Sequence, residues 1–452
     1  MNDAPKIIVI GGVAAGPSAA AKARRTNPKA RITLYEAGDT VSYGVCEMPY
    51  LIDGEIDSPD TLVLFSPGEL AKKKKIDVKA RHRVHSIDPD ERTAEVENLD
   101  TGERFSDTYD AAIIATGTSP NTLSTVPSDA ENVFTYTNIQ AARTFLAHLD
   151  EQRPSKVCVI GAGYIGLEVA ESLQSRGLSV TVIDADSLPF PYMDEESRKK
   201  VAEIVKDAGT ELLLDRKIIG VREEYGRVNA VSTNKGDIQA DCFIVSVGFS
   251  PNVELVTKAG VKLGNDGAIA VDSTQRTNVE GIYAAGDCTE VYNPVTRKTQ
   301  MLPFATVSSK TGKVAGENAA GGSAEFAGAI PISALKIFEH EIAQAGNDCA
   351  TLKQEGYRTV TESIDSRTKV GFMPGAEPLY ISLSAEAASG RVLNANIIAK
   401  ENAALRMNTV ALAIRHGLTV HDLADGDFMY TPRLAPLWDP VLICAQQLQK
   451  KL

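Results

Sequence analysis

The chain has 452 residues, of which 43% are hydrophobic and 23% charged, and its formal net charge at pH 7 is −12. This length allows two to four domains with full hydrophobic cores, and the composition is ordinary for a soluble globular protein. The acidic balance argues against a nucleic-acid-binding surface and favours a cytoplasmic enzyme.

The sequence begins with MNDAPKIIVIGG, so a strand is expected almost at once and no room is left for a signal peptide. No apolar run approaches the length of a membrane span. The six cysteines, at positions 46, 158, 242, 288, 349 and 444, show neither metal-ligand spacing nor a disulfide framework. We therefore expect no metal site and a reducing compartment.

Residues 6–36 predict a dinucleotide-binding unit. KIIVIGGVAAGPSAAAKARR reads as an apolar strand, a glycine-rich turn and an alanine-rich helix, and RITLYE follows as a second strand. In such a unit the pyrophosphate lies at the helix N-terminus, and an acid at the end of the second strand binds ribose hydroxyls. Val13 occupies the position of the second glycine in the usual G-x-G-x-x-G pattern. The cofactor-binding candidates here are Gly11, Gly12, Ala14, Ala15, Gly16 and the acid Glu36.

The next segment, VSYGVCEMPY at 41–50, holds one cysteine, Cys46, and the nearest other cysteine is Cys158. Most solitary cysteines are small buried hydrophobic residues, which is the simplest interpretation of this segment alone. The run KKKK at 72–75 is most simply a solvated helix face. Neither segment identifies a function without the rest of the chain.

A second dinucleotide-binding unit, with the complete glycine pattern, lies at 156–184. KVCVIGAGYIGLEVAESL contains Gly161, Gly163 and Gly166, and the strand SVTVID ends in Asp184. The Asp184 carboxylate can accept hydrogen bonds from the ribose 2′- and 3′-hydroxyls and repels a 2′-phosphate. NADH should therefore be preferred over NADPH.

Three later segments complete the architecture. YDAAIIATGTSP ends in Ala115, Thr116 and Gly117, where the chain leaves the first nucleotide domain. NVEGIYAAGDCTEV runs into Gly286 and Asp287, whose carboxylate can meet the hydroxyls of a cofactor. Between about 328 and 452, strands such as EPLYISLSAE and RVLNANIIAK alternate apolar and polar residues and predict an antiparallel sheet with one covered face.

The order of these motifs resembles the pyridine nucleotide-disulfide oxidoreductases, flavoproteins with two dinucleotide-binding domains, over residues from about 6 to 320. The resemblance implies an α/β fold with two Rossmann-like domains. An FAD-binding domain (1–120 and 244–327) would be split by an inserted NAD-binding domain (121–243), and an α+β dimerisation domain (328–452) would follow. FAD and NADH are the implied cofactors, and a homodimer is the implied assembly.

The segment around Cys46 resembles the single-cysteine branch of this family: coenzyme A-disulfide reductases, coenzyme A-dependent persulfide reductases, and NADH oxidases and peroxidases. Ser42, Cys46, Pro49, Tyr50 and Gly54 match the coenzyme A pattern S-x-x-x-C-x-x-P-Y-x-x-x-G. No second cysteine follows for an internal disulfide, so the resemblance implies a mixed disulfide with coenzyme A. It also implies that Cys46 begins a helix beside the flavin, where the helix dipole favours the thiolate.

Four positions depart from the family pattern. Ala14 stands where peroxidases and many oxidases keep a histidine that assists a cysteine sulfenic acid, which weakens the peroxidase interpretation. Glu47 replaces a small residue, and its carboxylate should raise the pKa of Cys46 unless it points to solvent. Phe372 lacks the hydroxyl of a family tyrosine, and Arg433 replaces a proline.

The resemblance also assigns substrate-handling roles. Tyr430 matches a tyrosine that reaches across the dimer to the partner's active cysteine, where it could protonate the departing coenzyme A thiolate. With Cys46 and Ser42 it forms the candidate catalytic set. The positions that match contacts to the nucleotide end of coenzyme A are Arg25 and Lys74 and, as weaker matches, Ser18 and Lys22.

The remaining roles concern the cofactors. Tyr164 is expected to gate the flavin face until nicotinamide displaces it, and Glu168 to line that pocket. A helix is expected to start within the stretch from Phe304 to Thr306 and to point at the pyrimidine edge of the flavin, where its N-terminus stabilises negative charge. Three further cofactor-binding candidates are Ile165, Gly248 and Ala305.

Three functions fit these features. In the leading hypothesis NADH reduces FAD, and FAD reduces a Cys46 mixed disulfide with coenzyme A or a related persulfide or polysulfide. In the second, the protein is an NADH oxidase or passes electrons from the flavin to an iron–sulfur protein, without a cysteine relay. In the third, it is a redox sensor that binds flavin and nucleotide. Two complete cofactor units favour catalysis over binding alone.

Overall fold

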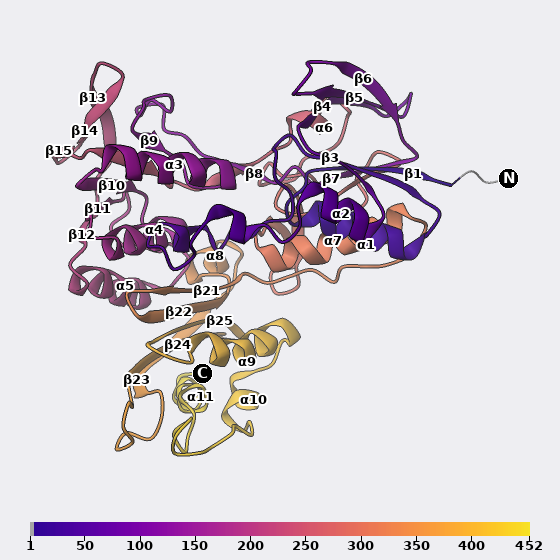
Figure 1. The fold of residues 1–452 in the computed structure, drawn as a ribbon. Helices are drawn as coiled ribbons and strands as arrows, with labels where there is room; N and C mark the ends of the chain where they lie inside the picture. The colour runs from indigo at the N-terminus through magenta and orange to yellow at the C-terminus, as the bar shows by residue number, and fades with distance from the viewer. Residues whose placement is uncertain (1–3) are drawn as a thin grey trace.

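The computed structural model describes residues 4–452 and divides into three parts, each built on its own five-stranded sheet (Figure 1). In Figure 1 the first nucleotide domain lies to the right, the inserted domain to the left and the C-terminal domain below them. The mixed α/β fold expected from the sequence is confirmed. Of the helices within residues 4–452, none combines the length and apolar character that a bilayer crossing requires.

The first domain is assembled from two separate stretches of chain. Its elements are β1 (Lys6–Ile10), α1 (Ala15–Thr26), β2 (Arg31–Tyr35), η1 (Met48–Leu51), η2 (Pro59–Leu62), α2 (Pro67–Lys74), β3 (Asp77–Lys79), β4 (His82–Asp88), β5 (Thr93–Asn98), β6 (Arg104–Thr108), β7 (Ala111–Ile114), β8 (Thr118–Pro120), β17 (Phe249–Pro251), α6 (Glu254–Thr257), β18 (Ile282–Ala284), β19 (Glu290–Asn293), β20 (Lys298–Met301) and α7 (Ala305–Ala319).

The central sheet of this domain is parallel, in the order β18-β7-β1-β2-β3. Successive side chains of a strand face opposite sides of its sheet. Ile7 and Val9 accordingly join the core beneath α1, while Ile8 and Ile10 join the core on the other face. Coverage on both faces explains why KIIVI is an almost continuous apolar run.

The inserted domain repeats this design with the order β12-β11-β10-β16-β9. Its elements are β9 (Val133–Phe134), α3 (Ile139–Gln152), β10 (Lys156–Ile160), α4 (Tyr164–Ser175), β11 (Ser179–Ile183), α5 (Glu195–Asp207), β12 (Glu211–Leu213), β13 (Ile218–Glu224), β14 (Arg227–Thr233), β15 (Gly236–Gln239) and β16 (Cys242–Val245).

The chain crosses between these two domains twice, and the two crossings pair as antiparallel strands β8 and β17. Thr116 Oγ1 donates to the Asn252 carbonyl over 2.7 Å, and Asn252 Nδ2 donates back to the Thr116 carbonyl over 2.9 Å. The predicted boundary between residues 243 and 244 falls inside β16, because Ile244 and Val245 still pair with β10. The inserted domain therefore continues a few residues further than expected.

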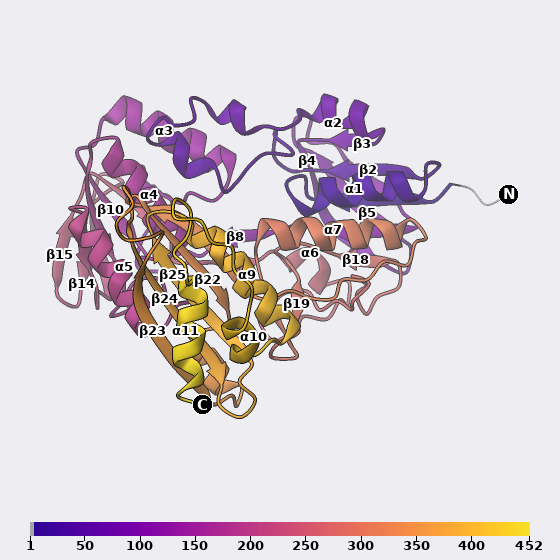
Figure 2. The same ribbon diagram turned by 90° about the horizontal axis from the view of Figure 1, so that it is seen from below.

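The C-terminal domain is an antiparallel sheet in the order β21-β22-β25-β24-β23, with helices on one face (Figure 2). Its elements are β21 (Ile332–Ile337), β22 (His340–Gly346), α8 (Cys349–Gln354), β23 (Thr359–Arg367), β24 (Pro378–Glu386), β25 (Val392–Ala399), α9 (Ala403–His416), α10 (Val420–Ala424) and α11 (Pro440–Gln449).

The expectation of one covered face is wrong for the central strands of this sheet, because all eight residues of β25 are buried. One face packs on α9 and α11, and Ile397 belongs to the core there. Ile398, on the opposite face, belongs to the core shared with the inserted domain. The polar residues of these strands point into a buried network in which Ser382 and Asn396 donate to Asp194, the N-cap of α5.

Candidate active site

The first glycine-rich turn is fixed by two close backbone contacts. Gly11 has a φ of +114°, and a Cβ there would collide with the carbonyl of Ala115; a Cβ at Gly16 would collide with the carbonyl of Gly11. These contacts press the first turn of α1 against β1 and β7. The N-terminus of α1, with exposed Ala14 as its cap and Ala15 as its first residue, therefore opens at the carboxyl edge of the sheet.

Glu36 follows β2 at the same edge and folds back onto this turn. Its Oε2 accepts from the Gly12 N–H and its Oε1 from the Gly38 N–H, both over 2.7 Å. A carboxylate beside the free N–H groups of a helix start is the donor and acceptor set that holds the ribose and pyrophosphate of a dinucleotide. The residues present fit an adenine dinucleotide here.

The second turn has the same geometry. Gly161 has a φ of +110° and lies against the Ser246 carbonyl, while Gly166 lies against the Gly161 carbonyl. Over Gly163 a Cβ would meet no atom within 4 Å, which leaves room for a pyrophosphate to approach the backbone. Asp184 accepts from the Ala162 N–H over 2.6 Å and thus repeats the position of Glu36.

A third group of candidates approaches from the second stretch of the first domain. Gly286 has a φ of +85°, and Asp287 after it receives a hydrogen bond from Ser308 in the first turn of α7. Burial raises the pKa of Asp287. Phe304 caps α7, whose first residues Ala305 and Thr306 are exposed. The helix start and the buried carboxyl fit the polyol and ring of a flavin.

The Ala115–Gly117 segment and Gly248 lie at the crossings between the domains. Gly117 and Gly248 have φ values of +64° and +89°. The Gly248 carbonyl accepts from the Asn121 N–H over 2.9 Å. These residues set the path of the chain from one nucleotide domain to the other.

Cys46 is exposed in a turn just before η1. The segment is held from the inserted domain, since Tyr136 Oη donates to the Met48 carbonyl over 2.8 Å and Arg176 Nη1 donates to the Ile52 carbonyl over 3.1 Å. Met48 is itself buried at this junction. The lone thiol therefore lies at the surface where the two nucleotide domains meet.

The expected α-helix start at Cys46 is not observed, because the following helix is a four-residue 3₁₀ helix that begins at Met48. The pKa of Cys46 is raised rather than lowered. The largest cause is partial burial of the thiol, which removes water that would stabilise the thiolate. The carboxylates of Glu47, Glu168 and Asp287 raise the pKa further. The Glu47 carboxylate folds back over Gly44, where it would overlap a Cβ.

Glu168 on α4 belongs to the same group of side chains. Burial and the neighbouring Glu171 raise its pKa to about 7, so both protonation states are populated near neutral pH. Burial and the charges of Glu168 and Glu171 also raise the pKa of Tyr50 in η1. Packing of α4 against η1 thus brings the carboxyl groups of α4 near enough to raise the pKa values of the Cys46 thiol and the Tyr50 phenol.

Ser42 is buried and holds the Cys46 segment against the first turn through its backbone. Its N–H donates to the Gly12 carbonyl over 2.8 Å, and its carbonyl accepts from the Leu64 N–H over 2.9 Å. Its φ of +52° is unusual for a non-glycine residue. These contacts fix the backbone of Ser42 between the first glycine turn and Leu64.

Tyr164 begins α4, followed by Ile165. Its ring stacks on Tyr192 with centroids 5.4 Å apart and meets Phe190 edge-on at 4.4 Å. Its hydroxyl lies 2.6 Å from Ser333 Oγ on β21. The tyrosine is therefore held between the inserted domain and the C-terminal domain.

The four coenzyme A candidates fall into two pairs. Lys22 forms a 2.6 Å ion pair with Glu317, and Ser18 Oγ lies 3.3 Å from Ser309 Oγ, so both face α7. Arg25 is exposed and Lys74 is half-buried, with its Nζ 5.5 Å from the centre of the Phe65 ring. Arg24 Nε donates to the Lys75 carbonyl over 3.0 Å, which joins the ends of α1 and α2 into one basic edge.

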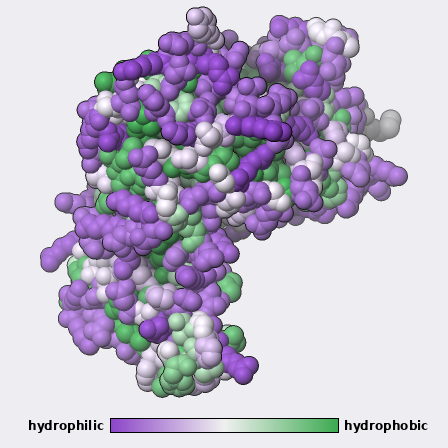
Figure 3. Space-filling model, turned by 60° about the vertical axis from the view of Figure 1, so that its left-hand side comes forward, coloured by the Kyte–Doolittle hydropathy of each residue, from purple (hydrophilic) through white to green (hydrophobic). Residues whose placement is uncertain are grey.

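Tyr430 lies in the segment between α10 and α11 and is 48% exposed in the single chain. Phe372, in the loop between β23 and β24, is 87% exposed. Within residues 4–452 the structure therefore places neither ring in the core of its own subunit. Hydrophobic surface, green in Figure 3, appears at the lower end of the molecule, where the C-terminal domain lies, and also across the upper part.

Three members of the site were not singled out from the sequence. Glu171 lies one helical turn after Glu168, so an i, i+3 pair of acids was the available signal. Tyr50 was part of the cysteine motif without a role. Tyr192 follows Asp184 by eight residues in an irregular segment, and no local pattern predicts its stacking on Tyr164.

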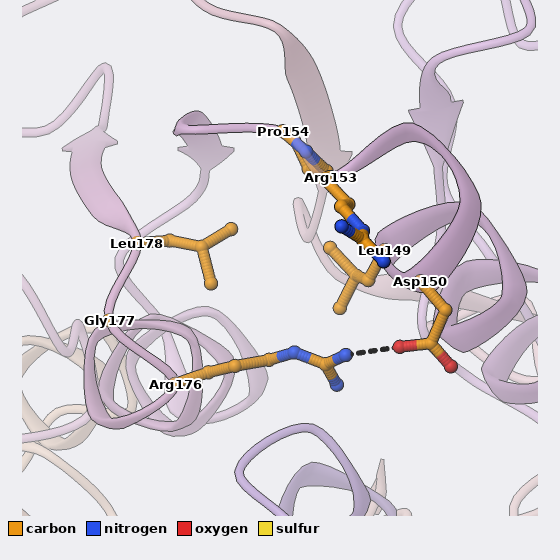
Figure 4. A pocket seen from close by; sticks show the side chains of 7 residues that line it. All are labelled: Leu149, Asp150, Arg153, Pro154, Arg176, Gly177 and Leu178. Carbon is orange, nitrogen blue, oxygen red and sulfur yellow. Dashed lines mark hydrogen bonds and ion pairs between the residues drawn. The ribbon is translucent and has the colours of Figure 1, made fainter.

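A surface cavity of the inserted domain lies away from its nucleotide turn (Figure 4). Arg176 and Asp150 form a 2.5 Å ion pair there, beside Arg153 and Leu178. Leu178 immediately precedes β11, whereas the glycine turn follows the carboxyl end of β10. The cavity therefore opens at the opposite edge of the sheet from the nucleotide turn.

The comparisons with known proteins agree with this geometry. Residues 5–312 match the family described as pyridine nucleotide-disulphide oxidoreductase, and residues 332–440 match the dimerisation domain of that family. The chain is 32% identical to the NAD(P)H sulfur oxidoreductase (CoA-dependent) of Pyrococcus furiosus, over 98% of this chain and 99% of the relative. It is 30% identical to an NADH oxidase of Methanocaldococcus jannaschii, over 99% of both chains.

Among solved structures, an NAD-dependent persulfide reductase from A. fulgidus superposes with a TM-score of 0.95 at 34% identity. The superposition covers 99% of this chain and 83% of that one. Both nucleotide turns, the split first domain and the C-terminal sheet are accounted for by one family. The chain belongs to the pyridine nucleotide-disulphide oxidoreductases and is an NAD(P)H-dependent flavoprotein oxidoreductase that uses FAD.

Proposed function

We propose that the enzyme reduces coenzyme A disulfide, or a related persulfide or polysulfide, with Cys46 as the one sulfur relay that the protein supplies. The observation that carries this proposal is the exposure of Cys46 where the two nucleotide domains meet, while Cys158, Cys242, Cys288 and Cys444 are buried. The names of relatives that act on coenzyme A-linked sulfur support it.

In the proposed cycle Cys46 starts as a mixed disulfide with coenzyme A. FAD, when bound, passes the two electrons of NADH to sulfur. Two electrons and one proton convert the mixed disulfide into the Cys46 thiolate and one coenzyme A thiol. The thiolate attacks a second coenzyme A disulfide, which restores the mixed disulfide and releases a coenzyme A thiolate that takes up a proton. The sum is NADH, one proton and coenzyme A disulfide giving NAD⁺ and two coenzyme A thiols.

The departing thiolate needs a proton, and two groups are proposed to provide it. One is the phenol of Tyr430, delivered from the second subunit of a homodimer. The other is Glu168, which burial keeps partly protonated near neutral pH. Ser42 is proposed to position Cys46 through the backbone bonds described above.

Arg25 and Lys74 are proposed to receive the phosphates of coenzyme A, since both sit on the basic edge at the ends of α1 and α2. Lys22 and Ser18 are weaker candidates, because each already has a partner on α7. The remaining three lysines of the run at 72–75 are proposed to be surface charge.

NADH is the proposed electron donor in preference to NADPH. Asp184 occupies the ribose position of the second turn, and Asp186 adds a second carboxylate beside it. The nearby Arg198 is engaged by Asp186 and by the carbonyls of Leu188 and Pro189, so a 2′-phosphate would have to displace those partners.

Replacing the sulfur of Cys46 tests the relay directly. Cys46→Ser should lower coenzyme A disulfide turnover by at least about a hundredfold while NADH still reduces the flavin, because the nucleotide turns are unaffected. Cys349→Ser is the matched control, since Cys349 is partly exposed but lies in α8 of the C-terminal domain. Stopped-flow spectra report flavin reduction, and a thiol assay reports product. Full disulfide turnover by Cys46→Ser would exclude the relay.

A second candidate function is an NADH oxidase, or electron transfer from the flavin to an iron–sulfur protein. The raised pKa of Cys46 favours it, because less thiolate is available to attack sulfur. In that case Cys46→Ser would consume oxygen or reduce the acceptor protein with NADH as fast as the unaltered enzyme. The same variant therefore separates the two candidates.

The assembly and location follow from the same proposal. The dimerisation domain supports a homodimer, and the proposed site uses Tyr430 from the opposite subunit. The cytoplasm is proposed as the compartment, because all six cysteines are free.

A further inference from the structure

Three segments of the C-terminal domain that are separate in the sequence, and that the contacts of one arginine connect, expose apolar side chains. They are the loop between β23 and β24, the outer face of α9, and the segment between α10 and α11. Exposed fractions run from 59% to 93% for Phe372, Leu405, Leu412, Met429, Leu434, Leu437 and Trp438. We call these seven residues the apolar surface; the match to the dimerisation domain includes all of them and indicates a second copy of this chain as the occupant.

One buried guanidinium connects the three segments. Arg406 lies on α9, and its Nη2 donates to the carbonyl of Thr368, at the start of the first loop, over 2.8 Å. Its Nε donates to Asp439 Oδ2, at the end of the segment between α10 and α11, over 3.0 Å. The two charged side chains are only 10% and 8% exposed.

Each contact of Arg406 ends on a residue that is itself fixed. Thr368 is fully buried, its N–H donates to the Glu377 carbonyl over 2.9 Å, and this bond closes the loop that carries Phe372. Asp439 caps α11 by accepting from the Val441 N–H over 3.0 Å. A buried ion pair costs desolvation on both sides, so its presence at this junction points to a role in geometry.

We propose that Arg406 is a positioning residue that sets the 368–377 loop and the 425–439 segment in one fixed arrangement, so that the apolar surface docks on a second copy. This proposal rests on the proposed function in one respect, namely that Tyr430 of the 425–439 segment acts at the other subunit's Cys46. Arg406 then determines both dimer affinity and the delivery of that phenol.

The test uses the full-length enzyme loaded with FAD. Arg406→Met would leave Asp439 buried and unpaired, so the principal variant is Arg406→Met with Asp439→Asn, which keeps an N-cap and removes both charges. Arg367→Met is the matched control, because the Arg367 guanidinium donates to the Ala376 carbonyl in the first loop alone. If thermal unfolding shows that the double variant does not fold, Asp439→Asn alone replaces it.

Sedimentation on dilution should show a dimer dissociation constant raised about tenfold or more in the double variant and unchanged in Arg367→Met. Hydrogen exchange should be measured at concentrations where every variant is dimeric. In the double variant the backbone amides should lose protection in both the 368–377 loop, at Ala376, and the 425–439 segment, at Ala435. With Asp439→Asn alone, amide protection should fall in the 425–439 segment. An unchanged dissociation constant, or lost protection confined to one segment of the double variant, would overturn the proposal.

Kinetics separate this proposal from the proposed function. In the double variant kcat for coenzyme A disulfide should fall while the KM for NADH and the rate of flavin reduction stay the same, a split that general destabilisation would not produce. If Cys46→Ser shows that no cysteine relay exists, the sedimentation and exchange results still decide whether Arg406 positions the surface.

Discussion

The environment of Cys46 is the main residue-scale departure from what a reactive thiol needs. Low-pKa thiols usually lie next to cations or at helix N-termini. Here the charged groups that act on Cys46 are the carboxylates of Glu47, Glu168 and Asp287. A thiol with a raised pKa has a smaller thiolate fraction at a given pH, so it attacks sulfur and other electrophiles more slowly. Glu47 is the member of this group that can be changed without touching either nucleotide turn.

Glu47→Gln should make Cys46 more reactive at a given pH. The Glu47 charge contributes to raising the pKa of Cys46, so its removal lowers that pKa and moves the pH midpoint of alkylation downward. Iodoacetamide labelling of the Cys46 peptide, followed by mass spectrometry from pH 6 to 10, measures the midpoint.

Glu55→Gln is the control for this measurement, since the charge of Glu55 acts on Tyr50 rather than on Cys46. Its midpoint should equal that of the unaltered enzyme. A Glu47→Gln midpoint that stays in place or moves to higher pH would show that the Glu47 carboxylate has no electrostatic hold on the thiol.

At the scale of elements, the first domain depends on the close approach of α1 and α7. Gly312 and Gly316 on α7 lie against the backbone of Ala15 and Ala19 on α1, where a Cβ would collide with carbonyl oxygens. Small residues let two helices pack backbone to backbone. This packing fixes the N-termini of both helices at the carboxyl edge of the sheet, beside the residues that fit a flavin.

Gly316→Ala should destabilise the enzyme even though alanine is the better helix former. The propensity gain is about 1 kcal/mol, but the added methyl group meets backbone that cannot rotate away, and such overpacking costs about 1–3 kcal/mol or more. Chemical denaturation should show a lower unfolding midpoint and weaker FAD retention.

Gly68→Ala is the control, because Gly68 is in α2 and a Cβ there meets nothing within 4 Å. This substitution should leave the unfolding midpoint unchanged or raise it. Equal effects of the two substitutions would show that the α1–α7 contact is not the limiting one.

At the scale of the whole molecule, the site is incomplete in a single chain if Tyr430 acts across the dimer. Tyr430 and Phe372 are both exposed in this chain, on a surface that the C-terminal domain presents as a unit. Closed twofold assemblies place the same surface of each subunit against the other. Two equivalent composite sites would then form.

Tyr430→Phe should lower coenzyme A disulfide turnover about tenfold or more and leave flavin reduction by NADH unchanged, because only one of the two proposed proton donors is removed. Mixing Cys46→Ser and Tyr430→Phe subunits in equal amounts should raise turnover above that of either variant alone, to about a quarter of normal, since half of the dimers contain one intact site of two. Turnover in the mixture measures this.

Tyr225→Phe provides the control, because Tyr225 is 99% exposed in the inserted domain, far along the chain from the dimerisation domain. Its turnover should match that of the unaltered enzyme. No recovery of activity in subunits shown to exchange would place Tyr430 outside the opposite subunit's site.

The sequence by itself determined the two nucleotide units, because a glycine turn, a helix and a terminal acid are local features set by steric limits on the backbone. Gly11, Gly16, Gly161 and Gly166 are each pressed against a carbonyl as the pattern requires. The order of the motifs also predicted that one nucleotide domain is inserted into the other. The predicted boundary at 243 fell inside β16, because strand ends carry no sharp signal in the sequence.

The sequence predicted that Glu47 raises the pKa of Cys46, but only the tertiary structure decided the contributions of burial, Glu168 and Asp287 and the partners of the candidate cations. Glu168 and Asp287 reach Cys46 from segments more than a hundred residues away in the chain, and Lys22 is engaged by Glu317 on α7. The pKa of a side chain depends on its burial and on charges brought near it by the fold, and neither is a property of local sequence. The same holds for Arg406, whose two partners meet only when α9 packs between their loops.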